Sequence, residues 1–321
     1  MGSERTTTMP VRLPPITDVA SRVLLEGIVD YAGLFPPAGI GMAAAVRNYA
    51  HYRASGDGWM LGRFVCPISG LDEFSRVADP FLPRDAGAIP WRLAVTGSGD
   101  AVADRIAIAD FNTRHRVCFD ECGAIVDAYE TRVDNARAVE KVGDAFGEDM
   151  LMYLEVPVQS ECDAIVAAIA RAGRRAKVRT GGTAPEAFPT SAQLVKFLSL
   201  CIEHDVTAKA TAGLHHALRG SHPLTYEKDA QCTTMFGFLN VFLAAALVTA
   251  GATETDAIAM LQETDWSNIG VNDLQFGWRG PEAVHVLDRV LLSQVRNHVL
   301  VSFGSCSFTE PVAESRELGL L

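Results

Sequence analysis

The stretch from residue 176 to residue 216 carries a repeated pattern around which the rest of the chain can be arranged. Each end is a short β-like run in which a glycine follows a lysine after four residues, KVRTG from Lys177 and KATAG from Lys209. Between the two runs, residues 190–205 carry apolar side chains at roughly helical spacing. A strand, a helix and a second strand form a βαβ unit with parallel strands. The two lysines are therefore predicted to lie at the same edge of one parallel sheet.

The rest of the chain repeats this alternation of strands and helices. Further β-like runs precede the unit at residues 27–37, 59–67, 91–97, 123–130 and 151–158. Helical patterns occur at residues 17–25, 42–55, 71–81, 101–114, 136–146, 162–172, 236–250 and 255–261. The last strand has two candidates, residues 267–272 and residues 299–304, and a helix is predicted between them over residues 281–298.

This alternation predicts an α/β protein that folds as a (β/α)8 TIM barrel, a single domain over residues 17–321. Residues 1–16 lack the apolar core of a signal peptide and are expected to form a flexible tail. Residues 219–240 are expected to form a long loop after the seventh strand, placed like a lid on the catalytic face, and a C-terminal extension follows. An open doubly wound sheet is the alternative, but no G-x-G-x-x-G motif follows the first strand.

The composition restricts the classes of partner. A formal net charge of −11 argues against nucleic acid or an anionic membrane surface, because both favour a basic protein. No apolar run reaches the length of a membrane-spanning helix, so residues 236–250 are expected to form a buried helix. The seven cysteines are an odd number at uneven spacing, which indicates no disulfide framework and favours the cytoplasm. Apolar residues near the C-terminus are compatible with a homo-oligomer.

The two lysines are the main chemical signal, because active sites of barrels lie at the C-terminal ends of the strands. The only other lysines in the chain are Lys141, Lys196 and Lys228. A lysine in a barrel mouth loses water and lies near other cations, so its pKa should fall and its neutral amine should become available. Schiff-base chemistry requires such an amine. The alternative is that Lys177 and Lys209 pair with barrel carboxylates or hold a substrate anion without forming a covalent bond.

The two lysine motifs resemble those of deoxyribose-phosphate aldolase and related class I aldolases. The resemblance implies that Lys177 on strand six forms the Schiff base with a carbonyl substrate. It also implies that Lys209 on strand seven acts as the cation that lowers the pKa of this nucleophile. The family uses an aspartate on an earlier strand for proton transfer, and Asp127 is the nearest match here.

The loop after strand six is a candidate anion site. Backbone N–H groups of Gly181 and Gly182 could bind a phosphate or carboxylate with the help of Arg179, although a tight turn that needs glycine accounts for the motif equally well. Thr180 in the same motif and Thr211 on strand seven are further substrate-binding candidates.

The adjacent histidines His215 and His216 follow strand seven. On an extended strand they would point in opposite directions, so at most one would face the site unless the loop turns between them. One of them could serve as a general acid or base, as a metal ligand beside Asp30, Glu155 or Cys306, or as a structural hydrogen-bonding group. Metal-dependent barrels of the isopropylmalate synthase type are similar in part, but their two histidines are separated by one residue. Glu155 ends an apolar strand and is a candidate for proton transfer or for pairing with a lysine, whereas Cys306 is interpreted as a packing residue or pocket wall.

The sequence therefore predicts a lyase, similar to an aldolase, that makes or breaks a carbon–carbon bond in a small anionic carbonyl substrate through Lys177, with no cofactor. One alternative is a lyase or isomerase that uses a divalent metal ion at His215, Glu155 and Asp30. The other alternative is a non-catalytic barrel that binds a small anion.

Overall fold

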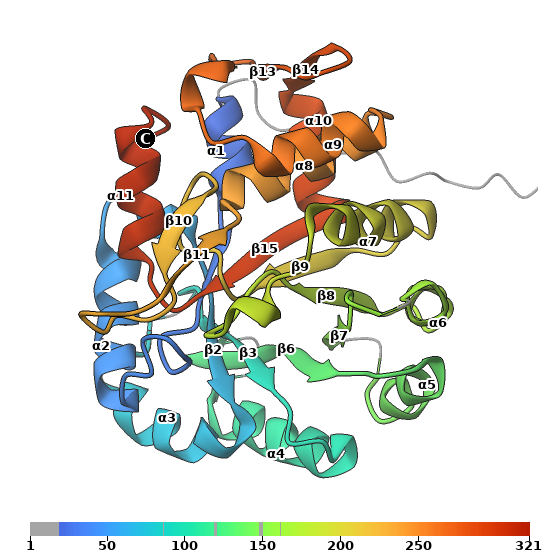
Figure 1. Ribbon diagram of the computed structural model, residues 1–321. Coiled ribbons are helices and arrows are strands. Elements are labelled where there is room, and N and C mark those ends of the chain that lie inside the picture. Colours follow the sequence, from blue (N-terminus) through green and yellow to red (C-terminus); the bar gives the residue numbers. More distant parts are fainter. Residues whose placement is uncertain (1–18, 86, 119–120, 148–149, 161) are drawn as a thin grey trace, which may run out of the picture.

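The chain folds around a closed barrel of eight parallel strands (Figure 1). The structure is a computed structural model that describes residues 19–321 apart from residues 86, 119–120, 148–149 and 161. The barrel strands are β1 (Val29–Tyr31), β2 (Leu61–Pro67), β3 (Trp91–Thr96), β6 (Ala124–Arg132), β7 (Leu151–Val156), β8 (Arg175–Arg179), β9 (Ala208–Thr211) and β15 (Leu300–Ser305). They follow one another around the barrel in chain order, and β15 closes it against β1. The predicted (β/α)8 barrel is confirmed.

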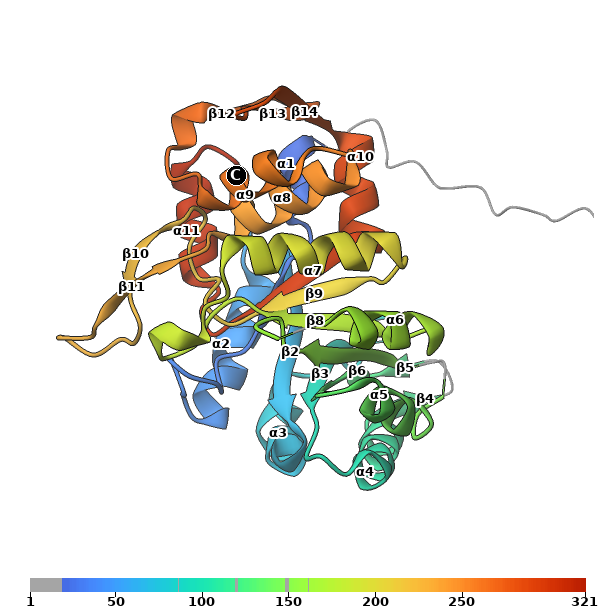
Figure 2. The same cartoon turned by 45° about the vertical axis from the view of Figure 1, so that its right-hand side comes forward.

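Helices surround the barrel (Figure 2). They are α1 (Ala20–Leu25), α2 (Met42–Ala54), α3 (Leu71–Ala78), α4 (Ala101–Arg114), α5 (Ala136–Gly143), α6 (Asp163–Arg171), α7 (Ser191–Glu203), α8 (Phe238–Thr249), α9 (Glu254–Gln262), α10 (Arg289–Gln294) and α11 (Thr309–Glu317). Two hairpins pair β4 (Arg116–Cys118) with β5 (Glu121–Cys122) and β10 (Gly220–Pro223) with β11 (Cys232–Met235). A separate antiparallel sheet contains β12 (Ile269–Val271), β13 (Gln275–Arg279) and β14 (Val284–Asp288). The predicted tail at residues 1–16 lies outside the described residues.

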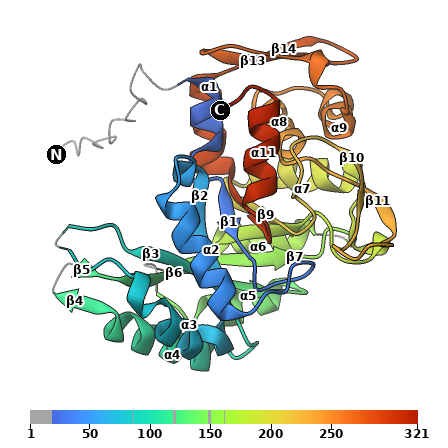
Figure 3. The ribbon, with the colours of Figure 1, turned by 90° about the vertical axis from the view of Figure 1, so that its left-hand side faces the viewer.

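The eighth barrel strand is β15, so the candidate at residues 267–272 is wrong. That segment contributes β12, which pairs antiparallel with β13 in a sheet set apart from the barrel (Figure 3). The prediction of a single helix over residues 281–298 is also wrong. This segment contains the strand β14, and helix α10 begins only at Arg289. In β14, Leu287 is buried while Val284 and Val286 are exposed, and this alternation belongs to a strand with one covered face.

The main core lies between the barrel and its helices. The first ten residues of α8 (Phe238–Thr249) are all buried, which confirms the interpretation of this apolar segment as an internal helix. Its Phe238 ring stacks on Phe303 of β15 with ring centroids 5.0 Å apart. Among the described residues, no helix is both long and apolar enough to cross a membrane.

One buried cation fastens the first helix to the last strand. Arg296 lies in a π-helical turn (Val295–Val299), and its guanidinium donates hydrogen bonds to the carbonyl oxygens of Leu24 and Glu26, each at 2.7 Å. It also donates to the carbonyl oxygen of Leu300 at 3.2 Å and to that of Val301. Burial lowers the pKa of Arg296 to about 10, so the group stays charged at neutral pH.

Replacing Arg296 with methionine should reduce the free energy of unfolding by about 3 kcal/mol, because buried carbonyl groups lose their donor. Urea unfolding followed by circular dichroism would measure the change. The control is Arg105→Met on the exposed side of α4, which should shift the free energy of unfolding by about 0.5 kcal/mol or less. Equal shifts in the two variants would contradict the role assigned to Arg296.

Candidate active site

A cavity of about 350 Å³ opens at the C-terminal ends of the barrel strands. Its lining includes Phe35, Pro37, Val65, Glu130, Lys177, Arg179, Gly182, Lys209, Thr211, His215, His216, Tyr226, Cys306 and Glu310. Most of these residues follow or end a strand, and residues 223–226 come from the β10–β11 hairpin. Part of the loop predicted at residues 219–240 therefore does lie at the C-terminal face of the barrel, although part of it forms this hairpin. Cys306 is a wall residue of the cavity, as expected.

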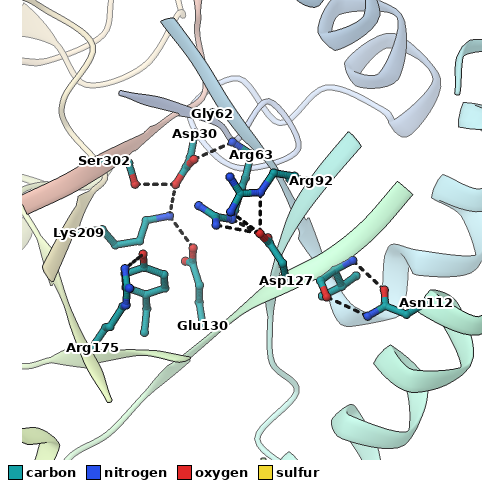
Figure 4. A network of polar contacts seen from close by, with 12 residues as sticks. Asp30, Gly62, Arg63, Arg92, Asn112, Asp127, Glu130, Arg175, Lys209 and Ser302 are labelled. Carbon is teal, nitrogen blue, oxygen red and sulfur yellow. Dashed lines mark hydrogen bonds and ion pairs between the residues drawn. The ribbon is translucent and has the colours of Figure 1, made fainter. Parts of the chain in front are cut away.

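Both predicted lysines point into the barrel at the same level. Lys177 of β8 is the register partner of Lys209 of β9. The Nζ atom of Lys177 lies 2.9 Å from Glu130 and 3.0 Å from Glu155. The Nζ atom of Lys209 lies 2.5 Å from Asp30 and 2.7 Å from Glu130. Figure 4 shows the Lys209 side chain reaching both carboxylates. Glu130 thus accepts hydrogen bonds from both ammonium groups, so two cations and three carboxylates form one continuous chain.

The two lysines differ in their surroundings. The side chain of Lys209 is 2 % exposed and that of Lys177 is 8 % exposed. Burial by itself would lower the pKa of Lys209, but the charges of Asp30 and Glu130 outweigh burial and raise its pKa above the usual range. Burial would raise the pKa of Glu130, but both ammonium groups lower it to about 2. Lys209 and Glu130 therefore stay charged throughout the neutral pH range.

Asp127 does not reach the cavity. Its carboxylate lies 2.7 Å from Arg63 and 2.5 Å from Arg92, closer to the N-terminal end of β6 than Glu130 is (Figure 4). Asp30 does not line the cavity either, and it accepts hydrogen bonds from Ser302 and from the backbone N–H of Arg63. The structure thus joins Asp30 to Lys209 as a positioning partner, and it does not bring Asp127 to the lysines.

The carboxylate that sequence reasoning missed is Glu130. It ends the predicted fourth strand, and this position at the C-terminal end of a barrel strand was the only feature of the sequence that could have identified it as a site residue. On a regular strand, residues 127 and 130 would face opposite sides of the sheet. Here β6 contains a bulge, because Leu93 and Ala94 of β3 pair with Val126 and Ala128 and leave Asp127 as an extra residue. The bulge allows both acids to point into the barrel.

The glycines of the two lysine motifs touch each other. A Cβ atom on Gly181 would lie 3.0 Å from the Cα atom of Gly213 and 2.5 Å from the ring of Phe188. Gly213 also has a φ of 73°, in the left-handed region that favours glycine. Gly181 therefore serves close packing of two loops, while Gly182 lines the cavity. Thr180 is fully buried and donates a hydrogen bond to the carbonyl oxygen of Ala212, so its role is structural.

Arg179 and Thr211 line the cavity and are register partners on β8 and β9. Within the described part of the chain, the guanidinium of Arg179 makes no hydrogen bond or ion pair. This group contrasts with the two fully paired lysines. Arg179 is thus an available cation at the cavity, and planar guanidinium groups suit carboxylate or phosphate. Glu155 lies beside a smaller neighbouring cavity of about 190 Å³ that Arg179 also lines.

Both histidines line the same cavity, although an extended strand would allow only one of them to face it. Ala212 and Gly213 both have positive φ values, and this turn breaks the alternation of an extended strand before His215. His215 Nδ1 lies 3.1 Å from the Ser305 hydroxyl. His216 Nδ1 lies 2.6 Å from a carboxylate oxygen of Glu314. Tyr226 and Glu310 complete this side of the cavity, and sequence reasoning identified neither.

The residues of the predicted metal site have separate partners. Asp30 is engaged by Lys209, Glu155 by Lys177, and His215 by Ser305. Over residues 19–321, outside the gaps, no group of three or more histidine, cysteine, aspartate or glutamate side chains is arranged to hold a metal ion.

No model of a known protein family matches the chain, and a search of curated proteins finds no matching sequence. These comparisons neither support nor oppose the resemblance to class I aldolases. The function must therefore be inferred from the chemistry of the cavity.

Proposed function

We propose that the protein is a lyase that forms a Schiff base between Lys177 and a small anionic carbonyl compound and then makes or breaks a carbon–carbon bond. The observation that carries this proposal is the position of the Lys177 amine. It lines the barrel cavity beside Glu155, and its register partner Lys209 is a buried permanent cation. A Schiff-base nucleophile must be a neutral amine, so the proposal requires the Lys177 ammonium to pass its proton to a neighbouring base.

The surroundings favour Lys177 over Lys209 as the nucleophile. Lys209 is held between Asp30 and Glu130 and is almost fully buried, so deprotonation there would leave Asp30 without its ammonium partner and remove one of the two cations on Glu130. Lys177 is more exposed, and Glu155 lies 3.0 Å from its Nζ atom. Glu155 is therefore the proposed acceptor of the lysine proton. Glu130 is a poorer acceptor, because two ammonium groups lower its pKa and make it a weak base.

The reaction is balanced without an external reagent. The Lys177 ammonium gives one proton to Glu155, and the neutral amine attacks the carbonyl carbon to form a C–N bond. The carbonyl oxygen takes up two protons in succession, one from the attacking nitrogen and one returned by Glu155, and leaves as water, which produces a protonated iminium. When the bond between the α- and β-carbons breaks, its electron pair forms the enamine double bond while the iminium π pair moves to nitrogen. The β-hydroxyl group gives its proton to the Glu155 carboxylate as the second carbonyl product forms.

Borohydride reduction tests this proposal, because it converts an iminium into a stable secondary amine. The protein would be incubated with a panel of small carboxylated and phosphorylated aldehydes and ketones, reduced and analysed by intact mass and peptide mapping. An adduct on Lys177 is expected. No adduct with any compound would refute the covalent mechanism.

Arg179→Ala should weaken binding of an anionic carbonyl probe, because it removes the available guanidinium at the cavity. A charge-assisted hydrogen bond of about 1.5–3 kcal/mol corresponds to an increase of about 10- to 150-fold in the concentration that gives half-maximal adduct. The maximal yield at saturating probe should be retained. The measurement is a titration of borohydride-trapped adduct, with a neutral ketone as the matched probe whose titration should not change.

The closed ion-pair chain favours one second candidate, a barrel that binds a small anion without chemistry. In such a protein the lysines would supply charge and rigidity only. Ligand-dependent melting without adduct or turnover would support this candidate and oppose the Schiff-base mechanism.

A further inference from the structure

A second cluster of polar side chains, centred on His215, lies at the cavity and takes no part in the proposed formation of the iminium. His215 lines the cavity with a side chain that is 11 % exposed, and its Nδ1 atom lies 3.1 Å from Ser305 Oγ. A carboxylate oxygen of Glu310 lies 3.8 Å from the same nitrogen and accepts a hydrogen bond from Tyr226 at 3.0 Å. These residues come from the loop after β9, the end of β15, the start of α11 and the β10–β11 hairpin.

We propose that His215 is the catalytic acid–base that removes a proton from the α-carbon of the Lys177 iminium and returns a proton to that carbon. This inference rests on the proposed Schiff-base function and adds a second catalytic residue to it. It also restricts the substrates to carbonyl compounds with a hydrogen on the carbon next to the carbonyl group that reacts with Lys177.

The proton transfer is balanced within the site. His215 takes the proton from the α-carbon, and the electron pair of the C–H bond forms a carbon–carbon double bond. The iminium π pair moves to the lysine nitrogen, which gives a neutral enamine and a charged imidazolium. In the reverse step the imidazolium returns a proton to the same carbon and restores the iminium.

The contacts of His215 suit both directions of this transfer. A serine hydroxyl can donate to or accept from Nδ1, so Ser305 is compatible with either neutral tautomer. The Glu310 carboxylate can stabilise the imidazolium once it forms. The Glu130 carboxylate also lines the cavity beside the lysines and could act as a base. Its two ammonium partners lower its pKa, however, and make it a weak one.

Burial keeps His215 neutral at physiological pH, although several titratable groups surround it. The titratable groups that face it are Glu310, Glu314, His216, His222 and Cys306. Burial lowers the pKa of His215 to about 4, although Glu310 opposes the shift. A base with this pKa is unprotonated from about pH 5 upward, so proton abstraction should be independent of pH near neutrality and should halve near pH 4.

The test separates adduct formation from proton transfer. Pyruvate is the probe, because it is a small anionic ketone whose methyl protons are exchangeable. One sample would be trapped with borohydride, and a second would be kept in D2O while NMR follows deuterium entering the methyl group. His215→Asn should keep the Lys177 adduct and slow the exchange by about 100-fold or more. His298→Asn, a change of an exposed histidine just before β15, should leave both unchanged.

Each outcome decides between the two proposals. Absence of both adduct and exchange in the unmodified protein, with pyruvate and with every other compound of the carbonyl panel, would overturn the Schiff-base function, and this inference with it. Adduct without exchange in the unmodified protein, or undiminished exchange in His215→Asn, would overturn the role of His215 alone. Loss of the adduct in a folded His215→Asn protein would also overturn it, because that result assigns the residue to binding.

Two further measurements apply if His215→Asn fails to fold by circular dichroism. Glu310→Gln removes the carboxylate that stabilises the imidazolium, and it should slow exchange by about tenfold while it preserves the adduct. The exchange rate of the unmodified protein should follow the pH dependence described above. A rate that stays constant to pH 4, or that Glu310→Gln leaves unchanged, would overturn the inference.

Discussion

Replacing Lys177 with methionine is expected to eliminate both the borohydride-trapped adduct and turnover. Methionine retains most of the length of the side chain but has no amine, so no C–N bond to a carbonyl carbon can form. The expected loss of turnover is about 10⁴-fold or more, because the nucleophile of a covalent mechanism has no substitute. Intact-mass analysis after reduction and an assay of carbonyl product formation would measure the two effects.

Lys177→Arg is the matched control, because it keeps a cation between Glu130 and Glu155 and still lacks a usable nucleophile. It should be as inactive as Lys177→Met and more stable. If the arginine variant retained turnover, then Lys177 would act through its charge, and the anion-binding or non-covalent interpretation would replace the covalent one. An adduct mapped to Lys209 would keep the mechanism and exchange the roles of the two lysines.

Replacing Lys209 with methionine is expected to lower the free energy of unfolding by about 3–5 kcal/mol at pH 7. Removal of one partner from a buried ion pair leaves uncompensated charge in a region that water hardly enters. Here the loss affects two carboxylates, Asp30 and Glu130, whose side chains are 1 % and 3 % exposed. Urea unfolding at pH 7 would measure the change.

The pH dependence identifies the cause of that loss. A carboxylate without a cation in the barrel binds a proton more readily in the folded state than in the unfolded state. Folding of the variant then takes up protons. The difference in the free energy of unfolding between Lys209→Met and the unmodified protein should therefore become smaller as the pH falls from 7 to 5.

Lys196→Met is the control, because Lys196 forms an ion pair with Asp163 in which both side chains are about half exposed. Its effect should be about 1 kcal/mol or less. A similar small effect at Lys209, or a deficit independent of pH, would contradict the view that this cation holds the barrel carboxylates in their charged form.

Much of the architecture follows from local patterns. The αβ alternation predicts the barrel, because a parallel strand needs a crossover connection and helices are the usual crossover. Residues 101–114 form a helix with the predicted bounds, capped by Asp100. The final strand could not be chosen from pattern alone. Residues 267–272 and 299–304 have similar local character, and the choice depends on which one can pair with both β1 and β9.

The sequence by itself determines that Lys177 and Lys209 lie side by side at the C-terminal edge of a parallel sheet. This follows because strand alternation and the matched lysine-to-glycine spacing are properties of the local backbone. Only the tertiary structure decides which acids meet them. A bulge in β6 turns Glu130 toward both ammonium groups, and closure of β15 against β1 places Ser302 against Asp30, so that Asp30 is held beside Lys209.

The same division applies to the histidines. The sequence places His215 after strand seven, but the two left-handed residues at 212 and 213 turn it into the cavity, toward Ser305. Alternation along a strand fixes the side-chain direction only while the strand stays regular. Bulges, left-handed turns and contacts between distant strands are set by the whole barrel, so the structure alone determines the pairing, burial and charge of the site.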